Sequence, residues 1–209
     1  VLEIFELLQA AGGNPNGLYW YIGPTYGQAK EIAWSILKRI TPKNLLRKNP
    51  SESELSIELW NGSIIKLKGS DYPESLKGVP LDGCVMDEAA FQEEVVWTEI
   101  LRPQLMDKKG FCHFISTPRG TNWFTSLFNE ARRKKEAGDA DWDFFHFTTF
   151  DNPFIDKAEI ELSRETMPED KFNQEVLAIE SEDVGLQFPE FDYTKNTGLY
   201  TGDNTLMKV

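Results

Sequence analysis

Short apolar runs alternate with segments of helical spacing along most of the chain, and this alternation restricts the fold more than any other feature. The runs Leu18–Gly23, Gly83–Met86 and Phe111–Ser116 have the length and side chains of buried strands. Helical patterns follow these runs at 26–40, 93–106 and 121–135. Such alternation predicts an α/β fold, with a mainly parallel sheet and helices on both faces.

Several further elements are predicted around this framework. An amphipathic helix without an N-cap opens the chain at 1–11, and Gly12-Gly13 follows it as a stop signal. Residues 55–68 alternate around Asn61-Gly62, which prefers positive φ and therefore predicts an inserted β-hairpin. The remaining expectations are a strand at 143–149 and helices at 155–164 and 168–179.

Composition limits the classes of function. The formal net charge of -12 excludes a protein that coats nucleic acid with its whole surface, because phosphate binding depends on Lys and Arg. Any DNA contact is therefore local, at Lys66 and Lys68 on one strand or at 132–135 on one helix, where a plain solvated face is the alternative. The sequence has no apolar run long enough to span a membrane, so no membrane association is expected. Cys84 and Cys112 lie in strand-like runs, which favours buried thiols in a reducing compartment.

The most informative chemical pattern is the strand 83–86 followed by Asp87 and Glu88. Side chains at the carboxyl end of a parallel strand project toward the crevice where ligands bind. In a nucleotide hydrolase, such a pair gives Asp87 a hold on Mg²⁺ and gives Glu88 the water that attacks the γ-phosphate. The alternative is that both acids only begin a helix, where the helix dipole favours them.

Two further strand ends carry polar side chains. Ser116 and Thr117 follow the strand that begins at Phe111, where they are predicted to lie beside the same crevice and hydrogen-bond a phosphate; the alternative is a hydroxyl N-cap. Tyr26 and Gln28 follow the first strand, and an aromatic ring with an amide suits an adenine base.

In combination, these segments resemble the large subunit of viral terminases, from tailed bacteriophages or prophages. The likeness runs from about Leu18 to Asp192 and is most specific between Asp82 and Gly120. The matching segments are Pro24-Thr25-Tyr26, Gln28-Ala29-Lys30, Leu76-Lys77-Gly78, Asp82-Gly83-Cys84-Val85-Met86-Asp87-Glu88-Ala89-Ala90, Leu101-Arg102-Pro103-Gln104-Leu105 and Ser116-Thr117-Pro118-Arg119-Gly120.

The resemblance implies a RecA-like P-loop NTPase fold that uses ATP and Mg²⁺ to drive double-stranded viral DNA into the procapsid. The implied partners are the portal protein, the small terminase subunit and four further copies in a ring of five, in the cytoplasm of the host cell. Asp87 then corresponds to the Walker B carboxylate that holds magnesium, Glu88 to the catalytic glutamate, and Ser116-Thr117 to the motif that couples hydrolysis to movement. Lys77 resembles the trans-acting finger, which is often Arg, with an ordinary loop lysine as the alternative and Arg119 as the next candidate.

Two departures from the family pattern define the expected domains. The chain lacks the pattern Gly-x-x-x-x-Gly-Lys-Ser/Thr, so we expect residues 1–180 to be an ATPase domain without its phosphate-loop segment, which we expect just upstream of Val1. Residues 181–209 are expected to be a linker toward a nuclease domain that lies beyond this chain. The chain alone is expected to hydrolyse ATP negligibly. The alternatives are a non-catalytic assembly or DNA-binding fragment, and another RecA-type ATPase such as a helicase.

Overall fold

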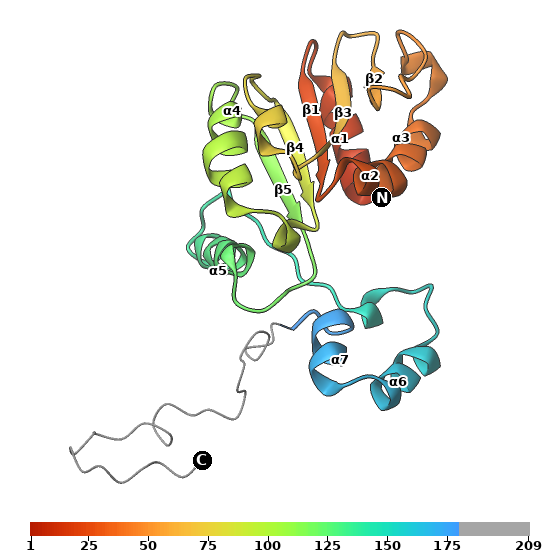
Figure 1. Ribbon diagram of the computed structural model, residues 1–209, viewed down its shortest axis with the longest axis vertical. Helices are drawn as coiled ribbons and strands as arrows, with labels where there is room; N and C mark the ends of the chain where they lie inside the picture. The colour runs from red at the N-terminus through yellow and green to blue at the C-terminus, as the bar shows by residue number, and fades with distance from the viewer. Residues whose placement is uncertain (180–209) are drawn as a thin grey trace, which may run out of the picture.

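The computed structural model describes residues 1–179 and consists of a twisted sheet with helices on both faces, followed by a small helical unit (Figure 1). The five strands are ordered β2-β3-β1-β4-β5. Parallel pairing joins β1 to β3 and to β4, and β4 to β5, whereas β2 runs antiparallel to β3. The strands are β1 (Leu18–Gly23), β2 (Ser56–Glu58), β3 (Ile64–Gly69), β4 (Gly83–Asp87) and β5 (Phe111–Ile115). The mainly parallel sheet predicted from the sequence is confirmed.

The helices in the first part of the chain cover one face of the sheet. These are α1 (Leu2–Gly13) and a continuous helical stretch made of α2 (Tyr26–Ala29), a π-helical turn (Lys30–Trp34) and α3 (Ser35–Ile40). Val1, at the N-cap of α1, makes no side-chain capping bond, whereas the Thr25 hydroxyl caps α2 by accepting from the Gln28 N–H at 3.1 Å. The side chains of Leu7, Tyr19 and Leu37 meet in the core beneath these helices.

The opposite face is covered by the middle of the chain. A π-helical turn (Val96–Leu101) continues into α4 (Arg102–Met106), and α5 (Trp123–Glu136) follows β5. Their apolar side chains join Trp20, Ile22 and Met86 in a second core. Tyr19 and Tyr21 therefore face one layer while Trp20 and Ile22 face the other, as expected for a strand buried on both sides.

The inserted β-hairpin is confirmed between β2 and β3. Gly62 has φ +85°, and the Leu59 N–H donates to the Ser63 carbonyl at 2.9 Å. The Asn61 side chain also donates to the Ala11 carbonyl at 2.7 Å, which fastens the turn to the end of α1. At the other end of β3, a Cβ on Gly69 would lie 2.2 Å from the Tyr26 nitrogen, so only glycine lets α2 begin this close to the strand.

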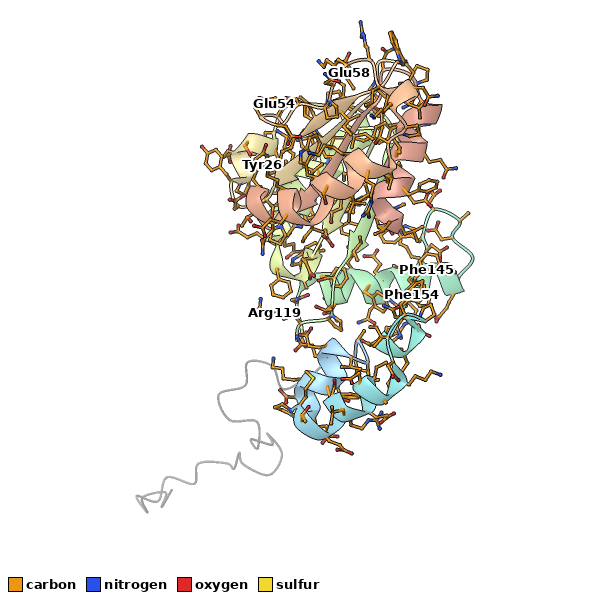
Figure 2. The ribbon with its side chains drawn as sticks, turned by 90° about the vertical axis from the view of Figure 1, so that its right-hand side faces the viewer. Tyr26, Glu54, Glu58, Arg119, Phe145 and Phe154 are labelled. Carbon is orange, nitrogen blue, oxygen red and sulfur yellow. The ribbon has the colours of Figure 1, made fainter. Side chains whose placement is uncertain are left out.

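The predicted strand at 143–149 is wrong. Among the described residues, this segment pairs with none of the five strands of the sheet, and the edge strand β5 does not exchange backbone hydrogen bonds with it. Phe144 packs edge-on against Phe128 of α5, while Phe145, which is labelled in Figure 2, stacks on Phe147, and both remain exposed. The alternation of side chains is present, but the pairing that makes a strand is missing.

The last described helices form a separate small cluster, α6 (Lys157–Thr166) and α7 (Glu169–Glu175), preceded by a 3₁₀ turn at Thr149–Asp151. Ile160, Phe172 and Val176 are its buried residues. Both helices were expected, although Pro168 lies at the N-cap of α7 rather than in its first turn. The expected linker at 181–209 lies outside the described residues, and no helix among residues 1–179 is long and apolar enough to cross a bilayer.

Candidate functional site: a carboxylate pair at the edge of the sheet

The functional residues predicted at the ends of β4 and β5 lie together. Asp87 is the last residue of β4 and pairs in register with Ile115, so Glu88 and Ser116 follow at the same level of neighbouring strands. The Ser116 hydroxyl oxygen lies 3.5 Å from Glu88 Oε2 and accepts the Ala90 N–H at 3.1 Å. Thr117 continues this loop and is half-buried. One edge of the sheet therefore carries both carboxylates and both hydroxyl groups.

The two carboxylates have different surroundings. Asp87 accepts a hydrogen bond from the Tyr21 hydroxyl at one oxygen and the Glu88 N–H, at 3.1 Å, at the other. Burial raises the pKa of the Glu88 carboxyl above its ordinary value. The negative charges of Asp87 and of Glu175 on α7 raise the pKa further, whereas the Ser116 hydroxyl opposes the rise. Glu88 therefore takes up a proton more readily than an ordinary exposed glutamate does.

The backbone at Glu88 is left-handed, with φ 52° and ψ 45°, a conformation that residues other than glycine rarely adopt. It occurs between the end of β4 and a 3₁₀ turn at Ala89–Phe91, where the chain must leave the sheet abruptly. Such strained residues cluster at functional sites because the surrounding structure has to hold them in place.

The other predicted site residues lie around this centre. Arg119 lies on the loop that carries Ser116, and its guanidinium stacks at 4.4 Å over the ring of Phe91, which is three residues after Glu88. Lys77 is exposed on the loop after the 3₁₀ turn Pro73–Leu76, and its ammonium group pairs with Glu74 at 2.7 Å. Lys77 therefore contacts a neighbour on its own loop rather than the carboxylates of this chain.

Tyr26 and Gln28 lie one strand away from the carboxylates, after β1. The Gln28 side-chain oxygen is 3.1 Å from the Thr25 hydroxyl, and the Tyr26 hydroxyl donates to the Ser53 carbonyl at 3.1 Å. Figure 2 shows Tyr26 beside Glu54, and Arg119 closer to the small helical unit. Tyr26 also lines a hollow of about 380 Å³ together with Lys68 and Tyr72.

Sequence reasoning missed two residues that support the site, Tyr21 and Gln92. Tyr21 lies inside an apolar strand, where its hydroxyl is not distinguishable in sequence from that of Tyr19. Gln92 is only 5% exposed and lies in a polar stretch, Gln92-Glu93-Glu94, that has the composition of a surface. The one sequence signal that could have pointed to Gln92 as a supporting residue is its position four residues after Glu88.

Comparisons with known proteins agree with this geometry. The family described as "Terminase large subunit, T4likevirus-type, N-terminal" matches residues 4–195. The chain belongs to this terminase large subunit family. A terminase large subunit of Escherichia phage T5 is 33% identical over 184 residues, covering 86% of this chain and 41% of that protein. The chain thus spans about two fifths of the length of this curated relative.

Solved terminase structures have the same fold. The Thermus phage P74-26 large terminase ATPase domain matches with a TM-score of 0.69 and 25% identity, over 86% of this chain and 81% of that domain. The large terminase of bacteriophage D6E in complex with ADP matches with a TM-score of 0.66 over 85% of this chain and 44% of that one, but at 16% identity this likeness concerns the fold alone. The terminase chain described here therefore has the RecA-like α/β fold expected from its motifs.

Proposed function

We propose that this chain is the ATPase part of a terminase large subunit, which hydrolyses ATP to move double-stranded viral DNA into the procapsid. The observation that carries the proposal is the arrangement of Asp87, Glu88 and Ser116 at the carboxyl edge of two adjacent parallel strands. Two structural relatives support it, because the Thermus phage P74-26 structure is a large terminase ATPase domain and the bacteriophage D6E large terminase was solved in complex with ATP-gamma-S.

The proposed cofactors are ATP and Mg²⁺. Residues 1–179 contain no cluster of three or more potential metal-ligating side chains that could hold an ion unaided. The adjacent carboxylates Asp87 and Glu88 nevertheless fit Mg²⁺, because this ion keeps several waters and is commonly bound by one or two carboxylates together with substrate phosphates. Asp87 is the proposed magnesium residue. When bound, the ion would neutralise charge on the phosphate oxygens.

Glu88 is the proposed general base. Its carboxylate would orient a water and accept its proton as the water attacks the γ-phosphate. A pKa raised by burial makes Glu88 a better proton acceptor than an exposed carboxylate. Ser116 and Thr117 are proposed to hydrogen-bond the phosphate beside Glu88 and so to couple hydrolysis to movement. Tyr26 and Gln28 remain the proposed adenine-binding residues, and the exposed Tyr26 ring is available for stacking.

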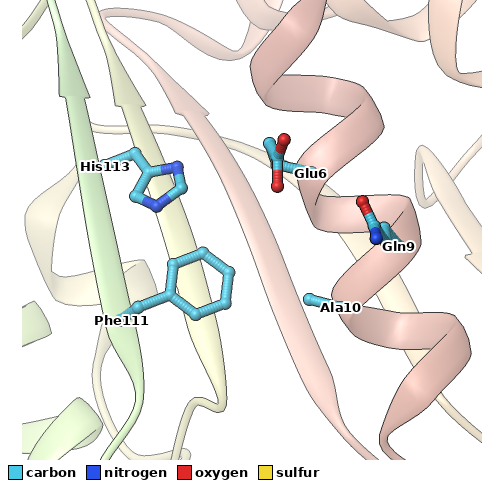
Figure 3. Close-up of a pocket in the computed structure, with 5 residues that line it drawn as sticks. All are labelled: Glu6, Gln9, Ala10, Phe111 and His113. Atoms are coloured by element: carbon cyan, nitrogen blue, oxygen red, sulfur yellow. The ribbon is translucent and has the colours of Figure 1, made fainter. Parts of the chain in front are cut away.

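The phosphate loop is proposed to come from a segment upstream of Val1 that pairs with β5. Within the described residues β5 is the last strand of the sheet, and Phe111 and His113 on it are half-buried. A hollow of about 320 Å³ lies between these two side chains and Glu6, Gln9 and Ala10 of α1 (Figure 3). An added strand would satisfy the free backbone groups of β5 and bring its loop next to Ser116.

Lys77 is proposed to act on the nucleotide of a neighbouring copy. Its ammonium group lies on an exposed loop and pairs with Glu74 rather than with Asp87 or Glu88, which supports a role across a subunit boundary. Arg119 is the alternative finger, since it lies on the loop that carries Ser116 and its guanidinium stacks on Phe91, in the turn that follows Glu88. The proposed assembly is a homo-oligomeric ring of five copies on the portal, in the host cytoplasm. The small subunit and a carboxyl-terminal nuclease domain complete the proposed machine.

A pair of nucleotide titrations tests the function. ATP binding is measured by calorimetry on the 209-residue chain and on a version extended upstream through the phosphate loop. Mg²⁺-dependent binding and turnover are expected only in the extended version, because the phosphates need the backbone amides and lysine of that loop. If the extended version neither bound nor hydrolysed ATP, the chain would instead be an assembly or DNA-binding module. Robust turnover by the 209-residue chain would show that the phosphate-binding groups lie within it.

A further inference from the structure

The strained turn at Glu88 requires something that holds it. A left-handed backbone at a glutamate is unfavourable by itself, and it persists only when the surrounding contacts determine it. The Ser116 hydroxyl provides one contact, by accepting the Ala90 N–H. Two other side chains reach the residue immediately before the turn, and neither takes part in the chemistry proposed above.

The first is Gln92, whose carboxamide nitrogen joins the ends of two strands. It donates to the Asp87 carbonyl at 2.7 Å and to the Ile22 carbonyl at 3.2 Å. Both partners are acceptors, so the NH₂ group must face them. The backbone carbonyl of Gln92 in turn accepts the Trp123 indole N–H at 2.8 Å, which connects this turn to the first residue of α5.

The second is Tyr21, which approaches the same residue from the opposite layer. Its ring is 3% exposed, and its hydroxyl donates to Asp87 Oδ2. The other oxygen, Asp87 Oδ1, accepts the Glu88 N–H at 3.1 Å. The Tyr21 hydrogen bond therefore fixes the orientation of the same carboxylate that binds the backbone of the strained residue Glu88. Gln92 therefore hydrogen-bonds the main chain of Asp87, and Tyr21 hydrogen-bonds its side chain.

We propose that Tyr21 and Gln92 are positioning residues that lock Asp87 and the left-handed Glu88 in their working orientation. This inference rests on the ATPase function proposed above. Both side chains contact Asp87 itself, so their proposed effect on the nucleotide and the attacking water passes through the two carboxylates. The groups that support a ligating carboxylate typically change metal affinity or activity by about 10–100-fold when removed.

The chain contains a matched control for each residue. Tyr19 is two residues before Tyr21 on the same strand face, is 2% exposed, and makes its hydrogen bonds with Ala10 and Asn14. Gln104 donates to the Leu76 carbonyl at 2.6 Å, and its side-chain oxygen, like that of Gln92, is buried without a partner in the described part of the chain. Tyr19→Phe and Gln104→Met therefore remove the same groups from comparable surroundings away from the carboxylates.

The kinetic test uses the upstream-extended chain with Tyr21→Phe, Gln92→Met and the two controls. We expect the first two variants to lower kcat by about 10–100-fold while the KM for ATP at saturating Mg²⁺ stays within about threefold. Tyr21→Phe should also raise the Mg²⁺ concentration needed for half-maximal rate. The controls should keep kcat near that of the parent. Equal losses in the variants and their controls would overturn the positioning role.

Hydrogen exchange on the 209-residue chain tests the same proposal without nucleotide or metal. Tyr21→Phe and Gln92→Met should speed exchange of the Glu88 and Ala90 amides by roughly 3–10-fold, as expected for loss of one hydrogen bond, while the controls leave these amides unchanged. If the parent extended chain did not hydrolyse ATP, the proposed function would fail, whereas the exchange result would still decide the positioning role. Unchanged exchange at both amides in the two variants would refute it.

Discussion

At the scale of single residues, the site depends on giving two adjacent carboxylates different environments. Asp87 is held at both oxygens by the Tyr21 hydroxyl and the Glu88 N–H. Glu88 lies beyond the strand end, and burial together with the charge of Asp87 raises its pKa. Neighbours in sequence thereby have different surroundings, which suits the separate roles proposed for them, a magnesium residue and a general base.

Replacement of the proposed base is the first prediction at this scale. In the upstream-extended chain, Glu88→Gln should keep ATP binding but lower kcat by roughly 10²–10⁴-fold, the usual contribution of a positioned base. Exposed Glu93 is the matched control, and Glu93→Gln should leave turnover unchanged. Steady-state kinetics and calorimetry measure the two quantities. Near-normal turnover in Glu88→Gln would assign the base to another group.

Thr117 gives a second prediction, which separates coupling from binding. In the intact motor, Thr117→Ala should depress DNA packaging while ATP affinity changes little, because the proposed place of its hydroxyl is beside the phosphate and not in the loop that binds it. Packaging per ATP hydrolysed and nucleotide affinity are measured side by side. A loss of affinity with unchanged packaging per bound ATP would contradict a coupling role.

At the scale of elements, α1 is tied to β5 by an ion pair that titrates. His113 Nδ1 lies 2.6 Å from Glu3 Oε2, across 110 residues of sequence. The hydrogen bond to Glu3 raises the pKa of His113 above its ordinary value of 6.5, burial opposes the rise, and the charges of Glu3 and Glu6 add to it. The folded state therefore binds a proton more tightly than the unfolded state does.

This linkage predicts a loss of stability as the pH rises. The contribution is fully present below pH 6.5 and is lost as the pH rises through the raised pKa of folded His113. Because both side chains are partly exposed, it should be at most about 1 kcal/mol, or roughly 2–4 °C in melting temperature. Thermal unfolding between pH 5.5 and 8.5 should show this slope in the parent and a smaller one in Glu3→Gln. An identical dependence of melting temperature on pH in Glu3→Gln and the parent would exclude the His113–Glu3 pair as its source. His146→Gln is the control, because it removes the second histidine and leaves this pair intact.

At the scale of the whole molecule, the position of Lys77 predicts behaviour that only an assembly can have. Lys77 is exposed and pairs with Glu74 on its own loop. If its charge stabilises the transition state in a neighbouring copy, Lys77→Ala should abolish the assembly-dependent part of ATP hydrolysis and leave monomers unaffected. Lys77→Arg should preserve or raise that activity, because a planar guanidinium can bind two phosphate oxygens.

Mixing two inactive variants provides the decisive measurement for Lys77. In upstream-extended chains, Lys77→Ala and Glu88→Gln subunits each carry the group that the other lacks, so mixed rings should recover part of the hydrolysis. Ring formation is verified independently by light scattering. No recovery in demonstrably mixed rings would leave Lys77 an ordinary loop lysine and direct the same experiment to Arg119.

The sequence by itself determined most of the elements and which carboxylate and hydroxyl side chains share one edge of the sheet. Apolar runs alternating with helical patterns predicted the parallel sheet, and Asn61-Gly62 predicted the hairpin, because these signals come from local backbone preference and side-chain periodicity. The order of motifs placed Asp87, Glu88 and Ser116 at one edge, since the carboxyl ends of parallel strands lie together.

Only the tertiary structure decided which residues hold that edge in shape. Tyr21 and Tyr19 have the same local pattern, and their roles differ only because β4 places Asp87 beside one of them. Gln92 looks like a surface residue until two strand ends enclose it. The side chains of residues 143–149 alternate as in a strand, but the segment does not form one. A strand requires a pairing partner, which no local pattern supplies. Contacts between distant segments depend on the packing of the whole chain, so periodicity and propensity cannot encode them individually.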